Sequence, residues 1–321
     1  MPVTAIGEQA ALVEALGFDG VGVTETNGNP FLAAGQAAQA TSHARVATAV
    51  ALAFPRTPMD VAYTAWDLQA LSGGRFALGL GTQVRAHVER RFGAVWSRPA
   101  ARMREYVLAL HAIWDAWETG GDLRFEGELY RHTLMPPNFR PAPADHPRPP
   151  VLLAAVRERM TEVAGEVADG LLGHAFCTPA VLADVTIPAL ERGLERGGRA
   201  RGDVEVTASV FVATSEQEWE ANRRRVAFYG STPGYRHVLD HHGLGDLFEA
   251  LHERSRAGGW AELPGLVDDE VLDLFVARGE DPATLAAAVR DRVGAVADRV
   301  CLVAEAADPA ALAPVAAGLR A

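Results

Sequence analysis

Two strand-like apolar runs each end in residues that could bind a ligand. The run 46–53 leads into the segment 53–56, and the run 75–81 leads into the segment 81–85, which begins with Gly81. Glycine lets a ligand approach the backbone closely, and Arg85 and His87 follow at once as candidate charged partners. The alternative interpretation is a tight turn with solvated charges.

Two titratable residues occupy the ends of other predicted strands. His174 closes the apolar segment 169–174, and Glu25 closes the segment 18–25. A histidine is suited to general acid or base catalysis because small shifts bring its pKa near neutrality. We therefore treat His174 and Glu25 as candidate catalytic residues. For each, a purely structural hydrogen-bonding role is the alternative.

Several other chemistries find no support in the residues. Adjacent histidines in a helix, such as His241 and His242, point apart, and spacing supplies no third ligand, so we expect no metal site. Cys177 and Cys301 form no redox or metal-type pair, which indicates reduced thiols. All 30 basic residues are arginines. The absence of lysine excludes Schiff-base aldolase chemistry, pyridoxal-phosphate anchoring and the P-loop lysine.

Composition indicates a globular protein with a large core. The chain of 321 residues is 49% hydrophobic and 22% charged, and its formal net charge of −11 argues against nucleic acid as a partner. No apolar run approaches the roughly 20 residues that span a membrane, and the first residues lack the pattern of a signal peptide. We therefore expect a cytoplasmic protein that acts on a small-molecule substrate, without a membrane partner.

Strand and helix patterns alternate along most of the chain, which predicts an α/β barrel over a single domain, residues 1–321. The clearest unit is 45–81, where Gly73 and Gly74 separate a helix from the next strand. Residues 120–150 contain a short hairpin and a proline-rich connection. Residues 216–278 are a mainly helical insertion before the last strand, and this insertion could act as a lid. The predicted helices are 6–16, 31–42, 59–71, 98–117, 158–167, 179–196 and 308–319, and the predicted strands are 18–25, 46–53, 75–81, 151–155, 169–174, 204–213 and 299–303.

One long segment resembles a known family signature. Residues 62–81, AYTAWDLQALSGGRFALGLG, are similar to the signature of the luciferase-like monooxygenase superfamily, and residues 17–21, 102–106 and 164–170 support the match in the family's order. Segments 53–56 and 81–85 most resemble the branch of oxidoreductases that use the deazaflavin coenzyme F420. The resemblance implies a luciferase-like (β/α)8 TIM barrel. Only residues 1–5 precede the first helix, so we expect the first strand to be truncated by a start that lies downstream of the native one.

The same resemblance implies where a cofactor binds. A deazaflavin or flavin would lie across the carboxyl ends of the strands, with its ring near a strained or cis peptide at Ala53 and Phe54. Among residue types, Gln83, Arg85, His87 and His174 suit hydrogen bonding to the ring edge and stabilisation of its anionic reduced form. Phosphate and ribityl contacts would come from Gly81, Thr82, Gln83, Arg102, Met103, Ala155, Val156 and Arg157.

The implied activity is coenzyme F420-dependent hydride transfer to or from a small organic substrate. Members that oxidise sugar phosphates carry a histidine and a glutamate where this chain has Thr26 and Val84, so a sugar dehydrogenase is not expected. Two alternatives stay open. One is an FMN-dependent monooxygenase fed by a separate reductase, and the other is a non-catalytic cofactor-binding protein on a decayed barrel. A homodimer is expected from the resemblance alone.

Overall fold

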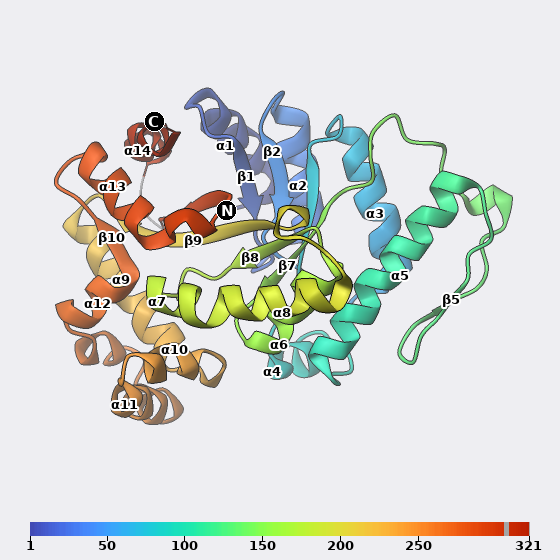
Figure 1. Ribbon diagram of the computed structural model, residues 1–321. Helices are drawn as coiled ribbons and strands as arrows, with labels where there is room; N and C mark the ends of the chain where they lie inside the picture. Colours follow the sequence, from blue (N-terminus) through green and yellow to red (C-terminus); the bar gives the residue numbers. More distant parts are fainter. Residues whose placement is uncertain (305–307, 321) are drawn as a thin grey trace. The chain divides into compact units, whose positions relative to one another are not determined.

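The computed structural model describes residues 1–304 and 308–320, which divide into two compact units. The first unit comprises residues 1–155, 159–171 and 190–204. The second comprises residues 156–158, 172–189 and the described residues from Glu205 onward. Helices alternate with parallel strands in both units, which confirms the predicted α/β class (Figure 1).

A parallel sheet forms the centre of the first unit. Its strands lie in the order β1 (Gly20–Val23), β2 (Arg45–Thr48), β4 (Phe76–Gly81) and β7 (Val151–Ala155), and β3 (Ala51–Leu52) pairs with the end of β4. Every residue of β4 is buried, as expected for a central strand of a parallel sheet. The side chain of Thr48 fixes the pairing of β2 with β4, because its Oγ1 donates to the carbonyl of Gly79 and accepts from the amide of Gly79.

Helices and one hairpin complete the first unit. Helix α1 packs on α2, and both contact β1 (Figure 1). Because α1 starts at Val3, residues 3–5 are helical and form no strand. Of the described helices, none is both long and apolar enough to cross a membrane. The elements are α1 (Val3–Ala15), α2 (Pro30–Ala40), α3 (Pro58–Leu71), α4 (Arg85–Arg90), α5 (Pro99–Thr119), β5 (Phe125–Glu126), β6 (Arg131–His132), η1 (Pro137–Phe139), α6 (Glu158–Val167) and η3 (Arg201–Asp203).

The signature segment 62–81 has a structural explanation. At the end of α3, Gly73 and Gly74 adopt positive φ angles of 65° and 84°, which reverse the chain into β4. The guanidinium of Arg75 then donates to the carbonyls of Ala38, Thr41 and Ala44, which end α2 and the loop after it. The segment therefore joins α2, α3 and β4.

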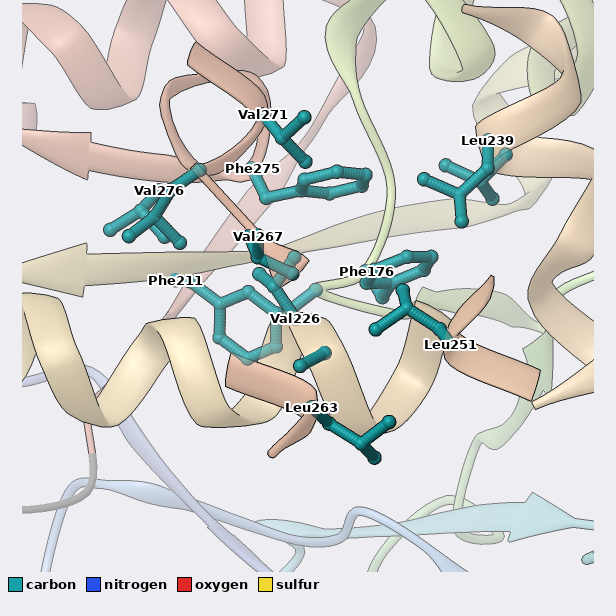
Figure 2. Close-up of a cluster of buried hydrophobic side chains, with 14 of the residues drawn as sticks. Phe176, Phe211, Val226, Leu239, Leu251, Leu263, Val267, Val271, Phe275 and Val276 are labelled. Carbon is teal, nitrogen blue, oxygen red and sulfur yellow. The ribbon is translucent and has the colours of Figure 1, made fainter. Parts of the chain in front are cut away.

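The second unit is built on strand β9 (Glu205–Ala213), which pairs in parallel with β10 (Val276–Arg278) and with β11 (Arg299–Val303). Its core contains the rings of Phe176, Phe211 and Phe275 (Figure 2). The rings of Phe176 and Phe275 stack with centroids 4.3 Å apart. The helical elements are α7 (Pro179–Val181), the π-helical turn η2 (Leu182–Thr186), α9 (Glu216–Gly230), η4 (Pro233–Tyr235), α10 (Arg236–His241), α11 (Gly245–Arg256), η5 (Leu263–Leu266), α12 (Asp269–Phe275), α13 (Pro282–Val293), η6 (Gly294–Val296) and α14 (Pro309–Arg320).

Three elements belong partly to each unit, namely β8 (Gly170–Gly173), α8 (Ile187–Gly197) and α6, whose first residue, Glu158, lies in the second unit. Two other elements differ from the prediction. The strand expected over 46–53 is two strands, β2 and β3, separated at the cis peptide bond between Ala49 and Val50. The insertion expected over 216–278 is helical up to Phe275, but its last three residues form strand β10, and helix α13 follows before β11. A strand of three residues is too short to show an alternating pattern.

Candidate functional site

The tips of β3 and β4 meet in the first unit. The amide of Ala53 donates to the carbonyl of Gly81 at 3.0 Å, so two residues predicted to bind a cofactor are adjacent. The cis peptide bond lies between Ala49 and Val50, earlier in the chain than the position expected near Phe54. A Cβ added to Gly81 would come within 2.6 Å of the Val50 side chain. Glycine is therefore required here by the protein's own packing, and ligand approach need not be the reason.

Glu25 is committed to an ion pair next to these tips. Its two carboxylate oxygens accept hydrogen bonds from the guanidinium of Arg56 at 2.8 and 2.9 Å, and one of them also accepts from the amide of Leu52 at 2.8 Å. The Glu25 side chain is only 4% exposed. The pair ties the strand before Glu25 to β3, so the structure supports a positional role for a residue that the sequence suggested for acid–base catalysis.

The segment after β4 leads into the short helix α4. Gln83 adopts a positive φ of 60°, and its side-chain oxygen accepts from the amide of Val84. The hydroxyl of Thr82 donates to the carbonyl of Gln83. Arg85 and His87 are both exposed, and Arg85 pairs with Glu89 at 2.9 Å. The predicted charged partners are therefore present on the surface, free to turn toward a ligand because solvent-exposed pairs are weak.

Helix α5 brings Arg102 onto Phe54. The Arg102 guanidinium carbon lies 4.4 Å from the centroid of the Phe54 ring. The same ring packs edge-to-face with Trp96, with ring centroids 5.6 Å apart. Nε of Arg102 donates to the hydroxyl of Tyr130 at 2.7 Å. Met103 is fully buried, so it supports α5 from the core. Two predicted cofactor residues from distant parts of the sequence thus come into contact.

A buried hydroxyl lies close to this cluster without a partner. Tyr106 is fully buried on α5, its ring packs edge-to-face on Tyr130 at 5.4 Å, and its hydroxyl has no hydrogen-bond partner among the described residues. Burial raises the pKa of Tyr106 well above its usual value, so the hydroxyl keeps its proton. Together with Arg102, it supplies polar groups that suit a ligand with anionic and polar parts.

The segment that ends the predicted strand 151–155 is divided between the units. Ala155 ends β7 in the first unit and is buried, whereas Val156 and Arg157 belong to the second unit. The Arg157 guanidinium donates to the carbonyls of Pro233 and Gly234 at 3.0 and 3.3 Å. These bonds hold it against η4.

His174 lies in an aromatic environment of the second unit. Its ring centroid is 4.5 Å from that of Tyr229 and 4.8 Å from that of Tyr235. Burial lowers the pKa of His174 to about 4, so the expected titration near neutrality is not found. Nδ1 accepts a hydrogen bond from the amide of Phe176, which places the single proton of the neutral ring on Nε2. At neutral pH this side chain is a fixed hydrogen-bond donor at Nε2.

The two adjacent histidines of the sequence, His241 and His242, each have a polar partner. His241 pairs with Asp184 at 3.2 Å, and His242 lies 2.7 Å from the hydroxyl of Thr178. No cluster of three or more histidine, cysteine or acidic side chains that could hold a metal occurs in the part of the chain that the structure describes.

Sequence reasoning missed Trp96 and Tyr130 and gave Arg56 no specific role. Arg56 follows a predicted strand tip, where a buried carboxylate partner was not visible. Tyr130 lies in the predicted hairpin, and its contact with α5 depends on tertiary structure. Only the general rule that aromatic and arginine side chains pack together could have suggested it.

Comparison with known proteins identifies the family. Residues 1–299 match the family model of the luciferase-like monooxygenases. An uncharacterized protein of Mycobacterium tuberculosis is 49% identical over 299 residues, which cover 91% of this chain and 88% of that protein. The 5,10-methylenetetrahydromethanopterin reductase of Archaeoglobus fulgidus is 26% identical over 280 residues, which cover 84% of this chain and 80% of that protein.

A solved structure has the same fold. The coenzyme F420-dependent tetrahydromethanopterin reductase from Methanopyrus kandleri aligns with a TM-score of 0.78 at 22% identity, over 99% of this chain and 94% of that one. The sequence resemblance is thereby confirmed at the level of the family, whose members include oxidoreductases and monooxygenases. The chain belongs to the luciferase-like monooxygenase family.

Proposed function

We propose that the protein is an oxidoreductase that binds coenzyme F420 and transfers a hydride to or from a small organic substrate. The observation that carries this proposal is the contact of Arg102 with Phe54, which joins two predicted cofactor residues beside the adjacent tips of β3 and β4. The archaeal relative is a 5,10-methylenetetrahydromethanopterin reductase, and the name of the similar solved structure includes coenzyme F420. The name of the solved structure supports the choice of cofactor, and the name of the relative supports a reductase.

The residues of the first unit fit such a group. Arg102 would bind an anionic part, the backbone of Gly81 and Thr82 would lie against the cofactor, and the buried hydroxyl of Tyr106 would gain a partner. Phe54 would exclude water from one side, because its ring is 3% exposed. When bound, the deazaflavin supplies the hydride chemistry, so the protein needs no nucleophile of its own.

In the second unit, we propose that His174 acts as a neutral donor to substrate. Its Nε2–H is fixed by the Phe176 amide on Nδ1, and the Tyr229 and Tyr235 rings limit its movement. A fixed donor can stabilise charge that develops on a substrate oxygen. With a pKa of about 4, the ring would not deliver a proton from an imidazolium at pH 7.

Fluorescence titration of the full chain with coenzyme F420 and, separately, with FMN tests the proposal. We expect saturable binding of coenzyme F420 and at least tenfold weaker binding of FMN. A tenfold difference in Kd corresponds to a difference of about 1.4 kcal/mol in binding free energy. Arg102→Gln should weaken coenzyme F420 binding. Arg131→Gln is the matched control, because the Arg131 side chain is exposed and forms an ion pair with Glu126 across the β5–β6 hairpin.

The family's description favours one second candidate, a monooxygenase. We propose FMN as the cofactor of this alternative, supplied in reduced form by a separate reductase. Preference for FMN in the titration, together with oxygen-dependent turnover when a reductase is added, would replace our proposal with this one. Tight coenzyme F420 binding without redox turnover over a broad substrate panel would instead indicate a non-catalytic binding protein. Failure to bind either cofactor would contradict the proposal outright.

A further inference from the structure

We propose that the β5–β6 hairpin is a brace that holds Arg102 in place for cofactor binding, with Glu105 and Tyr130 as positioning residues. This inference rests on the proposed function, because Arg102 is the residue assigned to the cofactor. All the contacts that carry it lie within the first unit.

The brace begins with Glu105 on α5. Its Oε1 accepts hydrogen bonds from the amides of Leu129 and Tyr130 at 2.6 and 2.5 Å. The amide of Gly127 donates to the carbonyl of Tyr130 and closes the turn. A Cβ at Gly127 would lie only 2.0 Å from the same Glu105 oxygen, so the carboxylate occupies the space that a side chain would need. Glu105 therefore fixes the hairpin tip on the helix.

The hairpin tip then fixes Arg102 through Tyr130. The Tyr130 hydroxyl accepts from Nε of Arg102 at 2.7 Å, and the Tyr130 ring packs edge-to-face on Tyr106. The guanidinium carbon lies 5.6 Å from the Tyr130 ring and 4.4 Å from the Phe54 ring. Nη1 of Arg102 also donates a hydrogen bond to the carbonyl of Val95. The plane of the guanidinium is thus fixed by contacts at several points.

This arrangement leaves one edge of Arg102 for a ligand. Nη2 has no hydrogen-bond partner within residues 1–304 and 308–320, while Nε and Nη1 are both engaged. An arginine whose other donors are held loses less conformational freedom when it binds an anion, so binding is tighter. A brace that acts in this way affects cofactor affinity more than it affects overall stability.

A double-mutant cycle on the full chain tests the brace. The variants are Tyr130→Phe, Arg102→Gln and the double variant, and the measured quantity is Kd for coenzyme F420. We expect Tyr130→Phe and Glu105→Gln each to raise Kd about tenfold, and we expect the double variant to bind no worse than Arg102→Gln alone. Glu126→Gln, which removes an exposed ion pair of the same hairpin, should stay within about twofold of wild type.

A second measurement is independent of the cofactor. Amide hydrogen exchange should be faster at Leu129 and Tyr130 in Glu105→Gln by about tenfold, and unchanged there in Glu126→Gln. If wild type binds neither coenzyme F420 nor FMN, the proposed function fails while the exchange data still test the brace. The brace is overturned if Tyr130→Phe binds coenzyme F420 as well as wild type, or if its loss of affinity adds in full to that of Arg102→Gln.

Discussion

At the scale of single residues, the pair of Glu25 and Arg56 shows how tertiary contacts change an interpretation. The sequence places Glu25 at a strand end, where a carboxylate is a plausible acid or base. The structure gives both of its oxygens to Arg56 and the Leu52 amide. A carboxylate so occupied cannot exchange protons with a substrate without first breaking these bonds.

Glu25→Gln should therefore lower the free energy of unfolding by about 3 kcal/mol, because it leaves Arg56 largely buried without its counter-charge. Urea unfolding measures this as a lower midpoint at an unchanged m-value. Asp122→Asn, which removes an exposed ion pair with Arg124, is the control and should change stability by less than about 0.5 kcal/mol. A variant with wild-type stability and a selective loss of kcat would show that Glu25 is catalytic after all.

His174 gives the second residue-scale prediction, which concerns pH. Its pKa is lowered from 6.5 to about 4 in the folded protein, so between these values the unfolded chain binds a proton that the folded chain does not. The contribution of His174 to the free energy of unfolding is therefore fully present above pH 6.5 and is lost as the pH falls toward 4. Between pH 7.5 and pH 5, wild type should lose up to about 2 kcal/mol more than His174→Asn, measured by urea unfolding at both pH values. Equal losses in the two proteins would mean that the ring titrates normally.

At the scale of elements, long periodic segments were predictable and short or broken ones were not. The predicted strand over 151–155 and helix over 158–167 are β7 and α6. Mainly apolar runs in the sequence marked β4 and β7 as strands that are buried on both faces. By contrast, β10 has three residues and no pattern, and the break between β2 and β3 lies inside an almost unbroken apolar run.

Helices α6 and α8 approach closely at glycines, which gives an element-scale prediction. A Cβ at Gly193 on α8 would lie 2.0 Å from the backbone carbonyl of Glu162, and one at Gly165 on α6 would lie 2.3 Å from that of Leu190. Backbone cannot move aside cheaply, so Gly193→Ala should cost roughly 2–4 kcal/mol of stability despite alanine's better helix propensity. Gly202→Ala, with open space around it, is the matched control. Thermal unfolding of both variants measures the difference, and equal values would show that the helices can separate.

At the scale of the whole molecule, the family and the α/β class followed from the sequence, while the contacts that make a site did not. The signature at 62–81 indicated the family. In the structure, its glycines and Arg75 hold α2, α3 and β4 together. The partners of Phe54, which are Trp96 and Arg102, come from another part of the chain. Periodicity reports which face of an element is buried, but it carries no information on which residue of another element meets it.

Cofactor binding should be visible in the stability of the whole chain. A ligand that binds only the folded state raises the free energy of unfolding by about 2.7 kcal/mol at 100 times its Kd, which corresponds to a few degrees in Tm for a chain of this size. Coenzyme F420 should therefore raise the Tm in calorimetry, and FMN at the same concentration should raise it less. Arg102→Gln should lose most of the coenzyme F420 shift, and Arg131→Gln should keep it. Because Arg102 lies among aromatic rings in the first unit, a shift that survives Arg102→Gln would mean that other residues bind the cofactor.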